Sequence, residues 1–298
     1  MAVLSGPVLL VVNPGARRAA RLAGVAAGEL RAQGLRCELL ETTGPGHAAA
    51  TLRAEPERWA AVFTLGGDGT VMEVLGALRG GSVPVGVLPA GTGNLIARAF
   101  GIPLGVRRAV RVLARGDVAR IDLGQLGGGR CFAFAAGVGV DAYMIANTPP
   151  HWKRRYGVLA YAIAAGRGVL THAPFHVRAV VDGQLIERTA TAVMLANFGS
   201  VLNRLVTLGP GIRQDDGRLD LCVFSPASAG QGARLMWRLF RGDFRPAPDV
   251  LWVPGRCFEI ATDPPLPAQA DGDLLGVTPF TAEVLPLAAC LLVPSAVP

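Results

Sequence analysis

The stretch Gly66-Gly67-Asp68-Gly69-Thr70 joins an apolar run at residues 60–65 to a helical pattern at residues 71–78. An apolar run, a glycine cluster and an amphipathic segment in this order predict a β-strand, a turn and an α-helix. Glycines let the backbone approach an oligophosphate closely, and the N–H groups and dipole of a helix start favour negative charge. The stretch therefore predicts a phosphate-binding turn.

A second segment of the same kind follows. Residues 84–88 form a short apolar run, and Pro89-Ala90-Gly91-Thr92-Gly93-Asn94 leads into a helical pattern at residues 95–100. Two such turns in consecutive strand–helix units predict a crevice for a nucleotide.

Asp68 is the one acid inside the first glycine cluster. A carboxylate at a helix start repels a phosphate bound there unless a cation lies between them. Its hard oxygen atoms suit Mg²⁺. We therefore predict that Asp68 is a magnesium ligand.

The first part of the chain, residues 1–118, alternates between strand and helix patterns. Strands are expected at residues 8–12, 36–41, 60–65 and 84–88, and helices at 16–33, 47–53, 71–78, 95–100 and 106–115. This alternation predicts an α/β domain, a parallel sheet with flanking helices that binds ligands at the carboxyl ends of its strands.

The second part, residues 119–298, changes to short strands separated by turn signals. Strands are expected at 120–126, 131–136, 175–181, 185–196, 219–224, 257–261 and 279–285, with helices at 153–170 and 228–241. This pattern predicts a mainly antiparallel β-sandwich domain. The tail at about residues 286–298 is expected to return to the α/β domain.

Composition narrows the function classes. The net charge of +7 would suit anionic lipid, nucleic acid or nucleotide phosphate. Lys153 is the only lysine, which excludes a Walker-type P-loop. No basic run interleaved with aromatic residues occurs, so nucleic acid is not an expected partner.

The five cysteines are scattered and form no Cys-x-x-Cys pair, as in proteins with free thiols in a reducing compartment. The N-terminal apolar run at residues 8–12 is too short for a signal peptide, and no run reaches the length of a transmembrane segment. These features predict a cytoplasmic protein.

Several further motifs occur in order along nearly the whole chain. They are Asn13-Pro14, Thr43 with Gly46-His47-Ala48, Gly66 to Thr70 with Glu73, residues 89–94, Ile121-Asp122-Leu123-Gly124, Gly137-Val138-Gly139-Val140-Asp141-Ala142, Lys153 with Gly157 and Tyr161, Asp216-Gly217-Arg218-Leu219-Asp220, and Asp271-Gly272-Asp273. Taken together, this series resembles the diacylglycerol kinase catalytic family, specifically its soluble bacterial lipid kinase branch, with sphingosine and ceramide kinases as more distant relatives.

The resemblance implies transfer of the γ-phosphoryl group of ATP to a lipid hydroxyl, with Mg²⁺ as cofactor. Diacylglycerol, giving phosphatidic acid, is the default acceptor. The lipid would be met at a membrane surface, so transient association with the inner face of the membrane is expected. A homodimer is left open.

The resemblance also implies roles for individual residues. The residues implied to contact the nucleotide are Asn13, Thr43, Gly66, Gly67, Gly69, Thr70, Glu73, Gly91, Thr92 and Asn94. Asp68 would lie near the catalytic Mg²⁺, and Asp122 would belong to the same acidic network. Asp273 would be the base that takes the proton from the lipid hydroxyl. Asp216 would hold a structural Mg²⁺.

The chain departs from the family pattern at three places. Ala16-Arg17 stands where the family has Ser-Gly, and Leu95 stands where many members have aspartate. Asp273 stands in place of a glutamate and is shorter by one C–C bond, about 1.5 Å. The first departure puts the loop's phosphate contacts in question, the second the structural metal and the third the base.

Simpler explanations stay open for some residues. Thr70 and Glu73 have the spacing of a capping box, and Asp216-Gly217 has that of a hairpin turn. Residues 231–241 interleave apolar and basic side chains, which is typical of a membrane-surface helix and also of a helix that packs on a core.

Two other functions compete with a lipid kinase. One is a kinase for a soluble substrate, of the NAD kinase type, although the chain contains no Asn-Glu dipeptide to hold the ribose. The other is a catalytically weak nucleotide-binding module with a membrane or regulatory role, which the departures at Arg17, Leu95 and Asp273 would suit.

Overall fold

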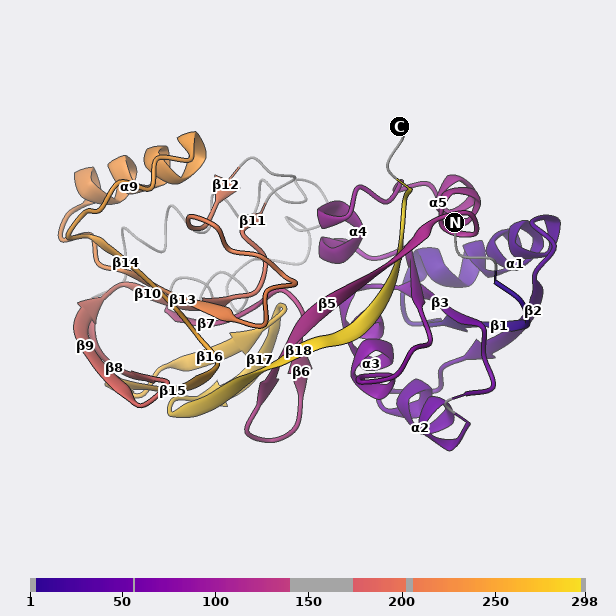
Figure 1. The fold of residues 1–298 in the computed structure, drawn as a ribbon, viewed down its shortest axis with the longest axis horizontal. Helices are drawn as coiled ribbons and strands as arrows, with labels where there is room; N and C mark the ends of the chain where they lie inside the picture. Colours follow the sequence, from indigo (N-terminus) through magenta and orange to yellow (C-terminus); the bar gives the residue numbers. More distant parts are fainter. Residues whose placement is uncertain (1–3, 56, 140–173, 202–205, 296–298) are drawn as a thin grey trace. The chain divides into compact units, whose positions relative to one another are not determined.

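The computed structural model describes residues 4–55, 57–139, 174–201 and 206–295 (Figure 1). These residues divide into two compact units, one within Met1–Ile121 and Leu287–Pro298 and the other within Asp122–Pro286. The helix predicted at residues 153–170, with Lys153, Gly157 and Tyr161, lies outside the described residues.

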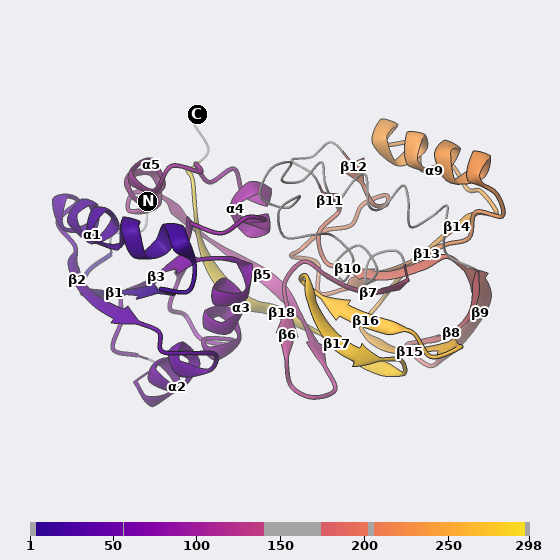
Figure 2. The same cartoon turned by 180° about the vertical axis from the view of Figure 1, so that it is seen from behind.

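The first unit is a parallel sheet with helices on both faces. Its elements are β1 (Pro7–Val12), α1 (Arg17–Ala32), β2 (Arg36–Glu41), α2 (His47–Ala54), β3 (Ala61–Gly66), α3 (Asp68–Ala77), β4 (Val85–Pro89), α4 (Leu95–Ala99) and α5 (Val106–Leu113). The strands lie in the order β2-β1-β3-β4 and all pair in parallel. Helices α1 and α5 pack together on one face, and α2 and α3 on the other (Figures 1 and 2). The predicted α/β fold is confirmed.

The strand order of the first unit reverses between β1 and β3. From β1 the chain passes to β2 on one side, whereas β3 and β4 extend the sheet on the other. In open parallel sheets, ligands bind at the carboxyl ends of the strands where the order reverses in this way. Asn13 follows β1 directly and Gly67 follows β3 directly, so both residues lie at this point.

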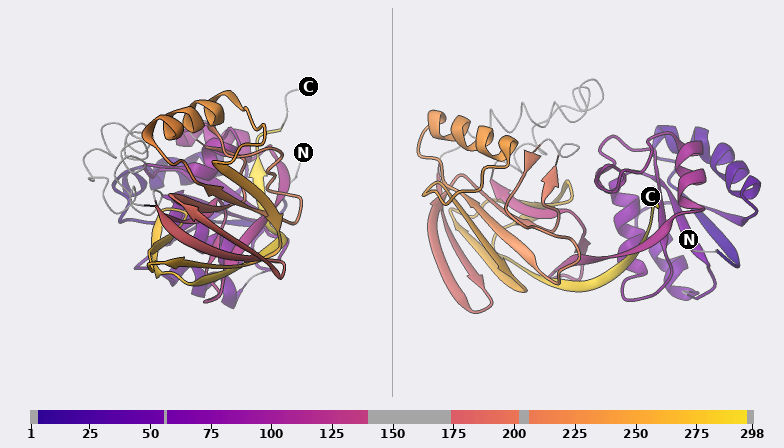
Figure 3. Two further views of the ribbon diagram at one scale, coloured as in Figure 1. Left: turned by 90° about the vertical axis from the view of Figure 1, so that its left-hand side faces the viewer. Right: turned by 45° about the horizontal axis from the view of Figure 1, so that its top comes forward.

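The second unit is a sandwich of two antiparallel sheets. Its elements are β5 (Asp117–Leu126), β6 (Cys131–Phe132), β7 (Ala135–Gly139), β8 (Phe175–Val181), β9 (Gln184–Ala190), β10 (Ala192–Ala196), β11 (Ser200–Val201), β12 (Val206–Thr207), β13 (Leu219–Phe224), α9 (Ala229–Arg241), β14 (Val250–Gly255), β15 (Cys257–Asp263), β16 (Pro267–Ala270), β17 (Asp273–Val277) and β18 (Phe280–Val293). One sheet has the order β18-β15-β8-β9 and the other β14-β13-β10-β7-β16-β17. The predicted β-sandwich is confirmed (Figure 3).

The side chains of β13 fill two different cores. Leu219, Leu221 and Val223 face the core between the two sheets. Cys222 and Phe224, which point the other way along the strand, pack with Leu235 and Leu239 of α9. Helix α9 is thus a third layer of the second unit. None of the helices within the described ranges combines the length and apolarity needed to cross a membrane.

The prediction of one strand at residues 185–196 was wrong, because two strands meet there. Strand β9 belongs to the first sheet of the sandwich and β10 to the second. Thr191 stands between them, and its N–H and hydroxyl both donate to the carbonyl oxygen of Phe224, at 2.8 Å and 3.3 Å. The chain changes sheets at this residue without a glycine or proline to mark the change.

Strands β14, β16 and β17 were not predicted. Each is short and carries a proline or glycine, residues that weaken a strand pattern in the sequence. Tertiary pairing compensates, since β14 pairs with β13, and β16 pairs with both β7 and β17.

Candidate functional site

At the carboxyl edge of the first unit's sheet, the loop after β1 is fastened to the start of α3. The Asn13 Nδ2 atom donates to Thr70 Oγ1 at 3.1 Å, and the Asn13 N–H donates to the carbonyl oxygen of Leu65 at 3.2 Å. A Cβ on Gly66 would lie 2.6 Å from Thr70 Oγ1. Gly66 therefore makes the space in which the buried Thr70 side chain holds Asn13.

The two glycine loops approach each other backbone to backbone. A Cβ on Gly91 would lie 2.6 Å from the Cα of Gly67, and a Cβ on Gly93 would lie 2.6 Å from Asp68 Oδ2. Packing between the loop backbones thus requires glycine at position 91, whereas a side chain at position 93 would displace the Asp68 carboxylate. Gly69 differs, because a Cβ there would meet nothing within 4 Å.

Asp68 links the starts of two helices. It is the first residue of α3, and its Oδ1 atom accepts a hydrogen bond of 2.7 Å from the N–H of Leu95, the first residue of α4. Burial raises the pKa of Asp68, while hydrogen bonds from the N–H groups of Leu95, Asn94 and Asp68 itself act in the opposite direction. The carboxylate therefore ties the two glycine loops together.

Asn94 closes the second glycine loop on itself. Its Oδ1 accepts from the N–H of Gly91 at 3.0 Å, and its Nδ2 donates to the carbonyl oxygen of Gly91 at 2.9 Å. The residue has a positive φ of 50° and is buried. Thr92 lies exposed within this loop. Leu95 takes part in the site through its backbone N–H, which donates to Asp68.

Thr43 and Glu73 act on the start of α2. Glu73 Oε1 accepts from the N–H of Ala49 at 3.1 Å, in the first turn of α2. The N–H of Thr43 donates to Nδ1 of His47, the first residue of that helix, at 3.1 Å. The capping-box alternative would require Thr70 to precede α3, but the residue that precedes this helix is Gly67. The Glu73 carboxylate therefore serves the neighbouring helix.

In the second unit, Asp122 holds the loop that carries Asp216. Asp122 is fully buried; its Oδ2 accepts from the N–H of Gly217 at 2.7 Å, and its own N–H donates to the carbonyl oxygen of Gln214 at 2.7 Å. Asp216 Oδ1 accepts from the N–H of Arg218 at 3.0 Å. The position of Asp216 thus depends on Asp122.

Two buried polar residues beside this loop received no role from the sequence, although Asp220 belongs to one of the quoted motifs. Burial and the nearby Asp216 carboxylate raise the pKa of Asp220 to about 6. Asn197 donates to the carbonyl oxygens of Asp122 and Ala133, both at 2.8 Å, while its buried Oδ1 has no hydrogen-bond partner among the described residues. An acid within the apolar strand at residues 219–224 was the signal for Asp220.

The donor atoms here fit a hydrated Mg²⁺. Within the described part of the chain, no three His, Cys, Asp or Glu side chains gather as a metal site. Mg²⁺, however, is usually held by one or two carboxylates and keeps several waters. Asp216 and Asp220 supply two carboxylates, and Asn197 adds an amide oxygen that has no hydrogen-bond partner among the described residues.

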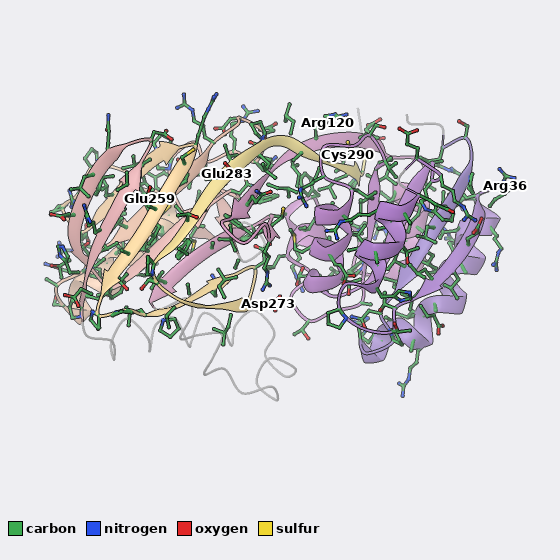
Figure 4. All side chains as sticks on the ribbon, turned by 90° about the horizontal axis from the view of Figure 1, so that it is seen from below. Arg36, Arg120, Glu259, Asp273, Glu283 and Cys290 are labelled. Carbon is green, nitrogen blue, oxygen red and sulfur yellow. The ribbon has the colours of Figure 1, made fainter. Side chains whose placement is uncertain are left out.

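Asp273 begins β17 on a hairpin that is firmly anchored. The preceding Asp271 has a positive φ of 47°, and its carboxylate accepts from the N–H groups of Ala133, Phe134 and Ala135 at 2.6, 2.8 and 3.0 Å. Asp273, labelled in Figure 4, is itself exposed. Its Oδ2 lies 2.6 Å from a guanidinium nitrogen of Arg130. These bonds to Asp271 were not anticipated from the sequence, which indicated only a turn.

A cavity of about 700 Å³ adjoins Asp273 within the second unit. Its walls come from the β5–β6 loop and from β8, β15, β17 and β18, and they include Arg130 and Leu274. Leu275 and Phe280 add apolar surface, whereas Arg178 and Glu259 add charge. A mixed lining of this kind suits an amphiphilic ligand.

The predicted site residues thus form separate groups. Asn13, Asp68, Asn94 and the glycines gather at the edge of the first sheet, with Thr43 and Glu73 at the adjoining start of α2. Asp122, on β5, holds the loop of the second unit that carries Asp216. Asp273 lies on the β16–β17 hairpin and pairs with Arg130 of the β5–β6 loop.

Two family models match this chain. Residues 7–126 match the diacylglycerol kinase catalytic domain, and residues 134–293 match the YegS C-terminal NAD kinase beta sandwich-like domain. The fold and these matches define a class of phosphotransferases. The chain belongs to the diacylglycerol kinase catalytic family, in the bacterial branch that carries the YegS-type C-terminal domain.

Several proteins are similar in sequence. The Citrobacter koseri protein named "Probable lipid kinase YegS-like" is 30% identical over 78% of each chain. A Mycobacterium tuberculosis diacylglycerol kinase is 29% identical over 78% of this chain and 76% of its own. An uncharacterized Synechocystis protein is also 29% identical, and the match covers 78% of this chain but only 54% of that protein.

Solved structures share the fold. A crystal structure of a diacylglycerol kinase from Bacillus anthracis is 22% identical, with a TM-score of 0.73 over 96% of each chain. Another crystal structure from the same organism is 23% identical and reaches a TM-score of 0.83 over 100% of both chains. At these identities the likeness establishes the fold alone.

The raised pKa of Asp220 predicts a pH dependence of stability. Because the folded state binds this proton more tightly than the unfolded chain, the free energy of unfolding should fall as the pH rises from 3.8 through about 6. Urea unfolding of wild type and Asp220→Asn at about pH 4 and about pH 7 measures this, and the loss should disappear in the variant. Asp215→Asn, which removes a carboxylate paired with Arg213, should behave as wild type. Equal pH dependence in wild type and Asp220→Asn would contradict the assignment.

Proposed function

We propose that this protein is an ATP-dependent lipid kinase, which transfers the γ-phosphoryl group to a lipid hydroxyl, with diacylglycerol as acceptor and phosphatidic acid as product. One observation carries the proposal. The glycine loops after β3 and β4 meet beside Asn13, at the point where the strand order reverses. Membership of the diacylglycerol kinase catalytic family supports the same reaction.

In this proposal the nucleotide phosphates lie against the start of α3. Backbone N–H groups at a helix start and the helix dipole attract phosphate. The open space at Gly69 leaves room for the phosphates to approach the backbone. Asn13, Thr43, Thr70, Thr92 and Asn94 border the nucleotide.

Carboxylates at two separate places would hold Mg²⁺. Asp68 lies at the start of α3, where Mg²⁺ would neutralise phosphate charge during transfer. Asp216, on the loop that Asp122 positions, and Asp220, on β13, would hold a second, structural ion. The hydrogen bond from Leu95 fixes the Asp68 carboxylate for this role.

Asp273 is proposed to accept the proton of the lipid hydroxyl as that oxygen attacks the γ-phosphorus. Positioning and charge neutralisation account for most of the rate of phosphoryl transfer, and a base contributes a further factor of about 10²–10⁴. Arg130 orients one carboxylate oxygen, and the anchored Asp271 turn fixes the backbone. The adjoining cavity offers apolar surface to the acceptor.

The acceptor also defines the proposed setting of the reaction. Diacylglycerol resides in a bilayer, so the protein would act in the cytoplasm and associate transiently with the inner face of the membrane. A homodimer stays a prediction.

Labelled ATP and Mg²⁺, supplied with diacylglycerol vesicles, sphingoid bases or NAD, test the proposal. Thin-layer chromatography should show phosphate in the diacylglycerol product. Labelling of NAD alone would identify a soluble-substrate kinase instead. Nucleotide binding without labelling of any acceptor would identify a non-catalytic module.

A matched glycine pair tests the nucleotide site. Gly69→Ala adds a methyl group to open space in a helix, so the melting temperature should hold or rise. ATP binding, measured by calorimetry, should nevertheless weaken because the phosphates need that space. Gly91→Ala should lower stability by roughly 1–3 kcal/mol, since the methyl group meets the backbone of Gly67. Unchanged ATP affinity in a folded Gly69→Ala variant would argue against phosphates at α3.

Asp273→Ala should lower kcat by roughly 10²–10⁴-fold with little change in melting temperature, because the side chain is exposed. Arg130→Ala is the matched control, since it breaks the same ion pair but leaves the carboxylate in place. It should retain much more activity. If the two variants lose kcat equally, the loss comes from breaking the ion pair and Asp273 does not act as a base.

A further inference from the structure

The outer face of α9 exposes two aromatic rings. Trp237 is 60% exposed and Phe240 is 51% exposed. They are the only aromatic residues among the exposed large hydrophobic residues of the described ranges. Their ring centroids lie 5.9 Å apart in a stacked arrangement. The other exposed large hydrophobic side chains in the described ranges, such as Leu39 and Leu185, are aliphatic. Single exposed aliphatic side chains are normal on protein surfaces. A stacked aromatic pair on one helix face indicates an interaction surface.

The helix that carries these rings is fixed in place. Leu235 and Leu239 anchor its inner face in the core over β13 and β14. Ser228 Oγ accepts from the N–H of Gln231 at the helix start, at 3.3 Å. Gly242, with a positive φ of 65°, ends the helix. The exposed rings therefore lie on a helix whose inner face is packed and whose two ends are fixed.

Positive charge surrounds the rings. Residues 229–249 contain four arginines and two aspartates. Within the described residues, the ion pairs of this stretch join Asp243 and Asp249 to Arg238 and Arg245. The other two arginines, Arg234 and Arg241, are exposed on the helix, and the Arg241 guanidinium lies 5.3 Å from the centroid of the Trp237 ring.

We propose that Arg234, Trp237, Phe240 and Arg241 form a docking surface for an anionic lipid bilayer. The inference rests on the proposed function, which requires access to a membrane lipid. Aromatic rings favour the interface between headgroups and acyl chains, and arginines on the same face reach the lipid phosphates while their stems stay on apolar surface. The excess of positive charge on this face favours anionic over zwitterionic lipid.

Vesicle co-sedimentation without nucleotide tests the surface separately from catalysis. Wild type should bind vesicles that contain phosphatidylglycerol more tightly than pure phosphatidylcholine vesicles. The double variant Trp237→Ala/Phe240→Ala should weaken binding by roughly 10- to 100-fold. Arg234→Gln/Arg241→Gln should weaken it by roughly fivefold per arginine and reduce its dependence on salt.

Leu39→Ala and Arg36→Gln, at exposed positions on β2, are matched controls that should bind vesicles as wild type does (Figure 4). Circular dichroism and melting temperature confirm that each variant is folded. A water-soluble short-chain diacylglycerol measures turnover without docking, and the α9 variants should keep that turnover.

Three outcomes would overturn the docking surface. The first is unchanged vesicle binding by the folded aromatic variant. The second is equal weakening in the controls. The third is a wild-type dimer that the aromatic variant abolishes, because α9 would then be an interface between two copies. Loss of turnover on the soluble acceptor in wild type would instead refute the kinase proposal.

Discussion

The close approach of two backbones, at Gly67 and Gly91, is the contact on which the candidate nucleotide site depends. It brings the loops after β3 and β4 within contact distance, so that the Asp68 carboxylate can accept the N–H at the start of α4. A side chain at position 91 would push these loops apart. Gly91 is thus needed for packing between the loops, whereas a Cβ on Gly69 would meet no described residue within 4 Å.

The second unit keeps two acids buried in different ways. Asp122 is compensated by hydrogen bonds to the loop at residues 214–217. Asp220 instead has a raised pKa, because burial and the neighbouring Asp216 disfavour its charge. A buried acid of this kind lowers stability near neutral pH and is typical of a site that holds a cation. The contrast separates a positioning residue from a candidate ligand.

Local signals predicted much of the fold. Glycine clusters after apolar runs located β3, β4 and the helices that follow them, because strand, turn and helix periodicity are properties of neighbouring residues. The change of sheet at Thr191 and the pairing of β16 depend on distant strands and left no local signal. In the site, Asp68 was identifiable as a lone acid among glycines. The hydrogen bond from the Ala49 N–H to Glu73, and the Asn197 oxygen that has no partner among the described residues, arise from tertiary contacts.

Strand β18 has a consequence for the order in which the chain becomes complete during synthesis. Its last residues belong to the first unit, where Leu291 pairs with Val85 of β4 and is fully buried. The ribosome makes this segment only after the whole second unit has been translated. Until then the β4 edge lacks its neighbouring strand, so the first unit acquires this strand only after the second unit has been translated.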